Sequence, residues 1–329
     1  MTATTGSLHT RDNGLTAARL MLALMVVVSH SFTLTGLTEP LVAETGQISL
    51  GIIAVLGFFG LSGYLVTASR DRLSVGPFLR NRALRIFPGY WLALVFGAIA
   101  AIVGAALVHQ RVAPADAVGY VVLNLALFPV VETLPPAFDG EWVNGSLWTL
   151  GIEAVCYVVL ALTPRRWLRP VALGLVPALL AVYAVREGFE LQLGLAFLAG
   201  SCAYLLRIPV TVLGTIAAVA IAVAGYALHL TPLAGMAVGF AALGLAKLPI
   251  RWERDVSYGV YVFAYPIGQV LGATVIATLG VGAMAAGTIA LVLPLAWLSW
   301  TLVESRAMRL RSRGVTIDQT TTRLASAAP

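Results

Sequence analysis

Residues 88–108 have the sequence PGYWLALVFGAIAAIVGAALV, and this stretch decides the class of fold. It carries no charged side chain, and its length suits a helix that crosses a lipid bilayer, which takes roughly 17–25 residues. The whole chain has the same character, because 59% of its 329 residues are hydrophobic and only 11% are charged. Its mean hydropathy is +0.89. A soluble domain carries about 25% charged residues, so the composition excludes a soluble α/β enzyme, a disordered chain and a disulfide scaffold.

Similar apolar stretches recur along the chain and predict an all-α, polytopic membrane helix bundle with about ten transmembrane helices. The breaks fall at polar or Pro/Gly clusters such as 35–46 and 247–255. The expected spans are 15–34, 47–67, 88–108, 146–163, 170–185, 191–206, 208–227, 230–246, 257–280 and 282–303. One further stretch, 117–131, is ambiguous because it is only about 15 residues long and contains Asn124 and Pro129.

The basic residues decide whether 117–131 crosses the membrane. If the N-terminus is cytoplasmic and this stretch does not cross, every Lys and Arg except Arg111 and Arg186 lies on the cytoplasmic side. If it crosses, all later segments invert and most of the basic residues move outside. The positive-inside rule favours the first arrangement. We therefore expect 117–131 to be a re-entrant or interfacial segment within an outer loop, 109–145, of a protein of a bacterial-type inner (plasma) membrane.

The same arrangement sets the domain organisation and the partners. One membrane domain covers 15–303, between cytoplasmic tails at 1–14 and 304–329, of which the second is expected to be partly disordered. The sequence pI is about 9.6. The basic residues lie at the edges of apolar stretches, which indicates a lipid bilayer rather than nucleic acid as the partner. The two cysteines, Cys156 and Cys202, lie inside apolar stretches and give no metal-ligand spacing, so no metal is expected.

Ionisable residues inside the spans are the first candidates for function, because they are costly within a bilayer. Arg19 and His30 are eleven residues apart. On a helix this spacing is within about 20° of three full turns, so the two side chains share one face. A face that carries both side chains is expected to point into the protein rather than into lipid. For His30 the alternative is a packing histidine held by the flanking Ser29 and Ser31.

Glu153 is the second candidate, in the fourth span. Counted from the outer edge at about 1.5 Å per residue, Glu153 lies about 10 Å deep and His30 about 6 Å deep. We therefore expect the two to face each other, with the carboxylate holding the imidazole of a general base. The alternative is a carboxylate bonded to Trp148 or Tyr157 that joins helices. The sequence leaves both open.

The inner loop 68–87 is the most basic segment, and within it Arg82 and Arg85 are spaced i,i+3 on one helical face. Two neighbouring guanidinium groups suit a phosphate-bearing ligand. The alternative is that they only set the topology and contact anionic lipid.

Five short motifs follow one another in order over nearly the whole chain. They are Arg19 eleven residues before His30, Phe58-Phe59-Gly60-Leu61-Ser62-Gly63-Tyr64, Arg82-x-x-Arg85-x-x-Pro88-x-Tyr90-Trp91, Gly145-Ser146-Leu147-Trp148-Thr149-Leu150-x-x-Glu153-x-x-x-Tyr157, and Ser257-Tyr258-Gly259-x-Tyr261. Together they resemble the acyltransferase-3 family of integral membrane acyltransferases. The resemblance implies transfer of an acyl group, commonly acetyl, from a cytoplasmic acyl-CoA to a hydroxyl of a carbohydrate or another envelope acceptor.

The resemblance also implies roles for single residues. It makes His30 and Glu153 the catalytic candidates, and it assigns Arg82 and Arg85, with Arg19 lower on the His30 face, to the acyl donor. Acyl-CoA would be a co-substrate, with no bound cofactor. The chain departs from the family where many members have His, at Ala264, and where many have Asp shortly before the first-helix arginine, at 15–18.

A second class of function stays open at this point. A multi-pass transporter or exporter of a glycan or lipid-linked substrate would also have many helices and buried ionisable residues. The sequence shows no inverted repeat of the kind that many transporters have. A carrier also does not require the Arg82/Arg85 pair, so neither observation supports that alternative.

Overall fold

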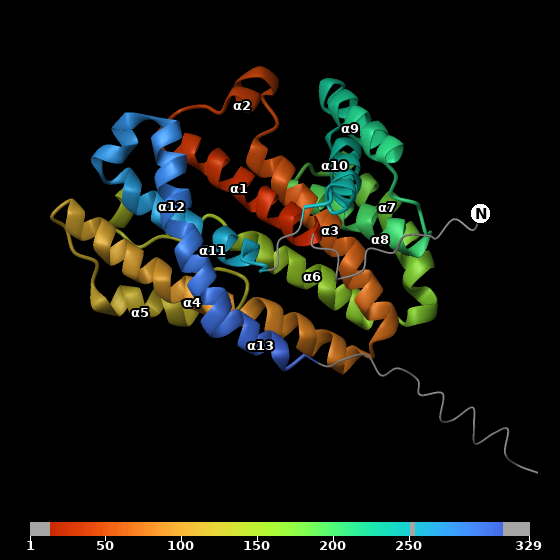
Figure 1. The fold of residues 1–329 in the computed structure, drawn as a ribbon, viewed down its shortest axis with the longest axis horizontal. Coiled ribbons are helices and arrows are strands. Elements are labelled where there is room, and N and C mark those ends of the chain that lie inside the picture. The colour runs from red at the N-terminus through yellow and green to blue at the C-terminus, as the bar shows by residue number, and fades with distance from the viewer. Residues whose placement is uncertain (1–13, 251–253, 312–329) are drawn as a thin grey trace, which may run out of the picture.

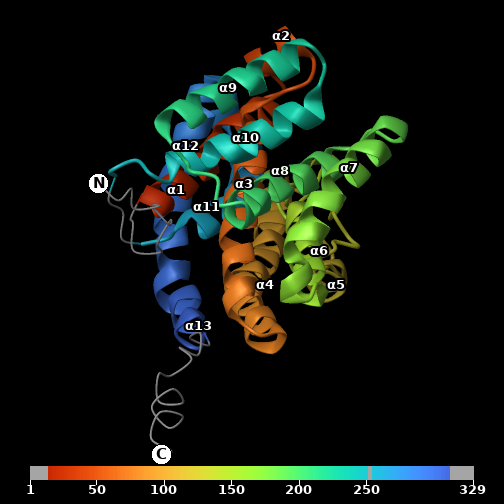
Figure 2. The same cartoon turned by 90° about the vertical axis from the view of Figure 1, so that its right-hand side faces the viewer.

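The computed structural model describes residues 14–250 and 254–311, and within them every named element is a helix (Figures 1 and 2). The all-α fold is confirmed. The only bridge outside helices there is the isolated pair Thr133 and Trp142.

Each expected span corresponds to a helix. The long helices are α1 (Gly14–Leu34), α3 (Leu50–Arg72), α4 (Val75–Leu107), α6 (Trp148–Leu162), α7 (Leu168–Val185), α8 (Phe189–Leu205), α9 (Val212–Ala227), α10 (Thr231–Leu245), α11 (Ser257–Gly272) and α12 (Val281–Ser299). The short elements are α2 (Pro40–Thr45), α5 (Pro114–Leu123), α13 (Ser305–Arg309), the 3-10 turns at 137–140, 165–167 and 275–279, and the π-helical turn η4 (Trp300–Glu304).

Five helical segments of the described ranges are long and apolar enough to cross a membrane. They are Gly14–Leu34, Leu50–Arg72, Val75–Leu107, Arg165–Val185 and Val281–Arg309. The other spans form helices of 15–17 residues, at or below the roughly 17 residues that a crossing needs. The chain is thus built as a multi-pass membrane protein, and ten crossings stays a prediction.

The basic segment 68–87 is more helical than its description as a loop implied. α3 continues to Arg72, and α4 begins at Val75 and runs through Pro88 without a break. Arg82 and Arg85 therefore lie on a helix whose later turns form the apolar stretch 88–108, and their positions are fixed by it.

The stretch 117–131 contains no helix of crossing length. The ten residues of α5 rise about 15 Å, half of the roughly 30 Å hydrocarbon thickness. After α5 the chain closes a loop on the side chain of Asn124, which donates to the carbonyl of Val131 at 2.6 Å and accepts from the amides of Val130 and Val131 at 2.7 and 3.0 Å. The hydroxyl of Tyr90 donates to two carbonyls of this loop and ties it to α4.

The end of the last helix extends beyond the expected boundary at residue 303. The π-helical turn η4 carries the chain directly into α13, and Glu304 is only 2% exposed. The bundle therefore includes residues that were expected in the tail. Of the expected tails 1–14 and 304–329, residues 1–13 and 312–329 lie outside the described residues.

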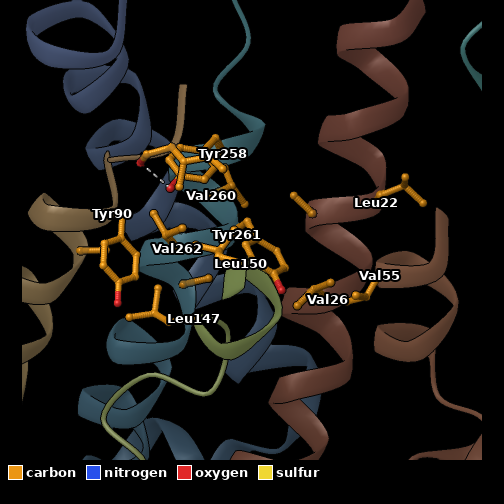
Figure 3. Close-up of a cluster of buried hydrophobic side chains, with 14 of the residues drawn as sticks. Leu22, Val26, Val55, Tyr90, Leu147, Leu150, Tyr258, Val260, Tyr261 and Val262 are labelled. Atoms are coloured by element: carbon orange, nitrogen blue, oxygen red, sulfur yellow. Dashed lines mark hydrogen bonds between the residues drawn. The ribbon is translucent and has the colours of Figure 1, made fainter. Parts of the chain in front are cut away.

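The centre of the molecule is α11, which packs against α1, α4 and α12. Figure 3 shows its residues Tyr258, Tyr261 and Val262 between Tyr90 on one side and Val26 on the other. Tyr90 and Val262 are completely buried. This packing fixes the rotation of α11 relative to α1 and α4, the helices that carry the candidate site residues.

Helices α3, α8 and α10 pack through four glycines, Gly60, Gly63, Gly200 and Gly239, which we call the glycine seam. A Cβ added at Gly60 would collide with the backbone of Gly239, one at Gly63 with the carbonyl of Phe197, and one at Gly200 with the carbonyl of Gly60. Small residues allow such backbone contact between membrane helices. The seam therefore joins the three helices into one wall beside α1.

Candidate active site

A polar pocket opens at the end of the bundle where α1 ends and α2 lies. Its volume is about 440 Å³, within the range of small-molecule sites. Polar side chains from several elements line it, namely Ser29, His30, Thr33, Thr38, Glu39, Gln47, Ser49, Ser146 and Thr149. Aromatic lining comes from Trp148, Phe189 and Tyr261. The pocket therefore offers hydrogen-bonding groups beside flat apolar surfaces.

His30 lies in the wall of this pocket and is the one sequence-predicted catalytic residue found there. Its ring meets that of Tyr265 edge to face, with centroids 4.9 Å apart and planes at 87°. Its Nδ1 atom is buried and has no hydrogen-bond partner within the described part of the chain. The ring is thus fixed in place by packing and keeps a nitrogen free of protein partners.

Glu39 is a pocket residue that the sequence analysis missed. It is 5% exposed, and its two carboxylate oxygens accept from the hydroxyl of Ser29 and from the amide of Leu50, both at 2.6 Å. These bonds tie α1 to the start of α3. No pattern could have pointed to Glu39, because it lies in a polar segment between two spans.

At the other end of the molecule, toward α13, a second polar site surrounds the predicted donor-binding arginines. Figures 1 and 2 both show α2 and α13 at opposite ends. Oδ2 of Asp255 accepts from Arg19 at 2.8 Å and from Arg85 at 2.7 Å. Arg85 also lies 3.5 Å from the carboxylate of Glu304. We call Arg19, Arg82 and Arg85 the arginine cluster; the structure brings two of its members together on one carboxylate.

Asp255 keeps its charge in this setting. Burial alone would raise its pKa, but Arg19, Arg85 and the hydroxyl of Ser257 favour the carboxylate and lower the pKa to about 2. The Ser257 hydroxyl donates to Oδ1 at 2.5 Å, so each oxygen of Asp255 has a donor. The carboxylate therefore neutralises part of the arginine charge at ordinary pH.

Arg82 differs from its neighbour Arg85. Arg85 is held by carboxylates and lies over the rings of Tyr258 and Trp300. Arg82 lies over the ring of Tyr157 with its guanidinium carbon 5.9 Å from the ring centroid, and its buried Nε has no partner in the described ranges. The two arginines of the R-x-x-R motif thus have different roles: one is neutralised, the other is not.

Glu153 does not hold His30. Its Oε1 accepts from the hydroxyls of Ser62 at 2.6 Å and Tyr157 at 2.5 Å, and no contact with His30 is present among the described residues. The expected facing pair is therefore corrected, and Glu153 joins α3 to α6 as in the alternative that names Tyr157. Depth along two helices did not determine which way the side chains turn.

Two faces connect the pocket with the arginine cluster. On α6, Thr149 lines the pocket and Glu153 follows one helical turn later. Tyr157 follows after a further turn and lies beneath Arg82. On α1, His30 lies in the pocket, while Arg19 reaches Asp255.

A third face runs along α11. Tyr258 lies under Arg85, Tyr261 bonds Thr149 at 2.6 Å in the pocket wall, and Tyr265 packs on His30. The three helices therefore surround one polar strip between the two ends.

Asp255 and Glu304 are the partners of the arginines that the sequence analysis missed. Asp255 lay in a segment that served only as a break between spans, and Glu304 lay just past the expected end of the domain. The position of Asp255 two residues before the Ser-Tyr-Gly motif is the only signal that could have indicated it.

The structure thus combines an all-helical bundle, a histidine in a polar pocket and a separate arginine cluster. The chain belongs to the acyltransferase-3 family, since the family model described as "Acyltransferase domain" matches residues 12–301. The resemblance drawn from the motifs is thereby confirmed. The protein is an acyltransferase.

Relatives extend this assignment. An "O-acetyl transferase" of Shigella phage Sf6 is 30% identical over 94% of this chain and 99% of its own length. "Nodulation protein 10" of Rhizobium leguminosarum bv. viciae is 26% identical over 91% and 94% of the two chains. "Exopolysaccharide production protein ExoZ" of Rhizobium meliloti (strain 1021) is 34% identical over 41% and 43%. No solved structure matches the chain significantly.

Proposed function

We propose that the protein transfers an acyl group, and specifically the acetyl group, from acyl-CoA on the cytoplasmic side to a hydroxyl of a carbohydrate or another envelope acceptor. The observation that carries the proposal is His30, whose ring lines a polar pocket with Nδ1 free of protein partners. The names of two relatives, an O-acetyl transferase and an exopolysaccharide production protein, support this acceptor class.

The chemistry assigned to His30 is general-base catalysis. The acceptor oxygen attacks the thioester carbonyl carbon while its proton passes to the imidazole, and the carbon–sulfur bond then breaks. The imidazolium returns the proton to the leaving thiolate, so an acyl ester and free CoA result. A base in this position contributes typically 10²–10⁴-fold to the rate.

The acceptor is assigned to the polar pocket. Its serine and threonine hydroxyls and Glu39 can exchange hydrogen bonds with a polyol, and Trp148 and Phe189, with ring centroids 6.0 Å apart, offer surfaces for the apolar faces of a sugar ring. The volume of about 440 Å³ is in the range of sites for small molecules or one end of a longer chain.

The donor is assigned to the arginine cluster. Guanidinium groups bind phosphates through paired hydrogen bonds. Arg19, the member of the cluster that lies on α1, is eleven residues from His30, which is about 16 Å along the helix. CoA carries its phosphates and its thioester at opposite ends of a long flexible arm. Such a donor can hold its phosphates at the cluster while its thioester reaches the pocket.

This assignment places the arginine cluster and both chain ends on the cytoplasmic side of a bacterial-type inner membrane. The positive charge of the basic segments supports that orientation. Transfer from acetyl-CoA added outside sealed inside-out vesicles, and its absence with right-side-out vesicles, would agree with this orientation.

The test is acyl transfer by the purified protein in nanodiscs, with radiolabelled acetyl-CoA and a panel of envelope glycans. We expect His30→Ala to lower transfer by about 10²–10⁴-fold while the thermal unfolding midpoint is kept. The matched control is His109→Asn, at an exposed position with φ of 59°, which Asn tolerates. Transfer by His30→Ala at the parental rate would remove the assignment.

A further inference from the structure

Arg311 and Arg82 share a property that separates them from Arg19 and Arg85. The latter two pair with Asp255, whereas neither Arg82 nor Arg311 has a carboxylate partner within 14–250 and 254–311. The Nε atoms of both are buried without a hydrogen-bond partner there. A guanidinium binds carboxylates and phosphates through such N–H groups, so both side chains have donors to spare.

Arg311 lies beside Arg82 in space although it comes from the far end of the chain. It follows α13, which packs on α4, and its Nη2 donates to the carbonyl of Asn81 at 3.4 Å. Asn81 directly precedes Arg82. The contact therefore holds Arg311 at the turn of α4 that carries Arg82.

Positive charge is concentrated at this point. Burial lowers the pKa of Arg311 to about 9, and repulsion by Arg82, Arg85 and Arg19 contributes in the same direction. The carboxylates nearest the arginine cluster are all engaged: those of Asp255 and Glu304 with Arg85, and that of Glu153 with Ser62 and Tyr157. An anion that arrives from outside would meet two guanidinium groups that the protein itself has left without a counter-charge.

We infer that Arg82 and Arg311 together bind phosphate groups of the acyl donor, with Arg85 acting as the neutralised support of the site. The inference rests on the proposed function, which names acyl-CoA as the donor. It adds a binding residue that lies beyond residues 12–301, the part matched by the family model. The same phosphate chemistry exists in anionic lipid headgroups, so the experiment has to separate the two sources.

The experiment is calorimetric titration of CoA and of pantetheine, which lacks phosphate, into the full-length protein in phosphatidylcholine nanodiscs. The variants are Arg311→Ala, Arg311→Lys and Arg309→Ala. Arg309 is exposed, lies two residues away and carries the same charge, so its variant controls for net charge. Unfolding midpoints of all variants are measured in the same nanodiscs, and Arg311→Lys keeps the test available if the alanine variant unfolds.

We expect Arg311→Ala to raise the Kd for CoA at least tenfold and Arg309→Ala to change it less than twofold. Arg311→Lys should restore only part of the affinity, because an ammonium lacks the planar fork. Pantetheine should bind all variants as it binds the parent protein. A loss of pantetheine affinity equal to that of CoA would overturn the phosphate role.

Three other results would count against the inference in different ways. If Arg311→Ala and Arg309→Ala weaken CoA binding equally, Arg311 only adds surface charge. If adding phosphatidylglycerol to the nanodiscs removes the difference between the parent and Arg311→Ala, the site belongs to lipid. If the parent protein binds no CoA under any condition, the proposed function itself fails, and Arg311 loses its ligand with it.

Discussion

Arg19 on α1 donates to Oδ2 of Asp255 at 2.8 Å, and the same oxygen accepts from Arg85 on α4. A single carboxylate oxygen, placed just before α11, thus joins the first helix to the helix that carries the R-x-x-R motif. Asp255 has 18% of its side chain exposed and Arg85 7%. The arrangement makes Asp255 a structural centre of the arginine cluster.

Asp255→Asn should destabilise the protein by about 3 kcal/mol, because removing one partner of a buried ion pair leaves the other charges without compensation. The measurement is the thermal unfolding midpoint in detergent. Glu190→Gln is the control, since Glu190 pairs with Arg186 on the surface with exposures of 40% and 75%, and such pairs contribute about 0–1 kcal/mol. Equal midpoints for the two variants would contradict the role of Asp255.

The stability should also fall in acid for the same reason. The pKa of Asp255 is about 2 when folded, below the ordinary value of about 3.9. A lowered folded pKa gives stability that is full above about pH 4 and is lost as the pH falls toward 2, about 2–3 kcal/mol in all. Unfolding midpoints between pH 6 and pH 3 should fall more steeply for the parent than for Asp255→Asn. Parallel curves for the two proteins would contradict this role of the Asp255 carboxylate.

Glu153→Gln should keep the fold, because an amide oxygen still accepts from Ser62 and Tyr157. We expect transfer to fall far less than in His30→Ala, with the acidic limb of the pH–rate profile unmoved. A carboxylate paired with the imidazole would behave differently, and its loss would move that limb to lower pH by about one unit or more. The two outcomes separate a residue that joins helices from a partner of the base.

Gly63→Ala should destabilise the protein by about 3 kcal/mol or more, since its Cβ would meet the Phe197 carbonyl across the glycine seam. Gly76→Ala is the matched control, because a Cβ at Gly76 meets nothing within 4 Å. The control should be neutral or stabilised by up to about 1 kcal/mol. Thermal unfolding midpoints of the two variants decide the point, and a tolerant Gly63 would show that the seam can open.

The sequence predicted features that depend on one helix and missed those that depend on two. Charge-free stretches located the helices, and the 3.6-residue period placed Arg19 and His30 toward the interior. Depth along the helices suggested a pair of His30 and Glu153, but depth does not determine rotation, and Glu153 turned to Tyr157. Asp255 and Glu304 were missed because a break between spans and a supposed tail gave no pattern that would bring them to Arg85.

The glycine seam has a mechanical consequence. Backbones in direct contact leave no side chains that could rearrange, so α3, α8 and α10 move together or not at all. A carrier that alternates its access needs one half of its helices to rock against the other, whereas here the wall next to α1 is a rigid plate. Arg19 and His30 both lie on α1, a single helix that packs on this wall, so the distance between them along the helix stays fixed. Under the proposed function, the part that moves is the flexible arm of the donor. Its length has to match the fixed distance along α1.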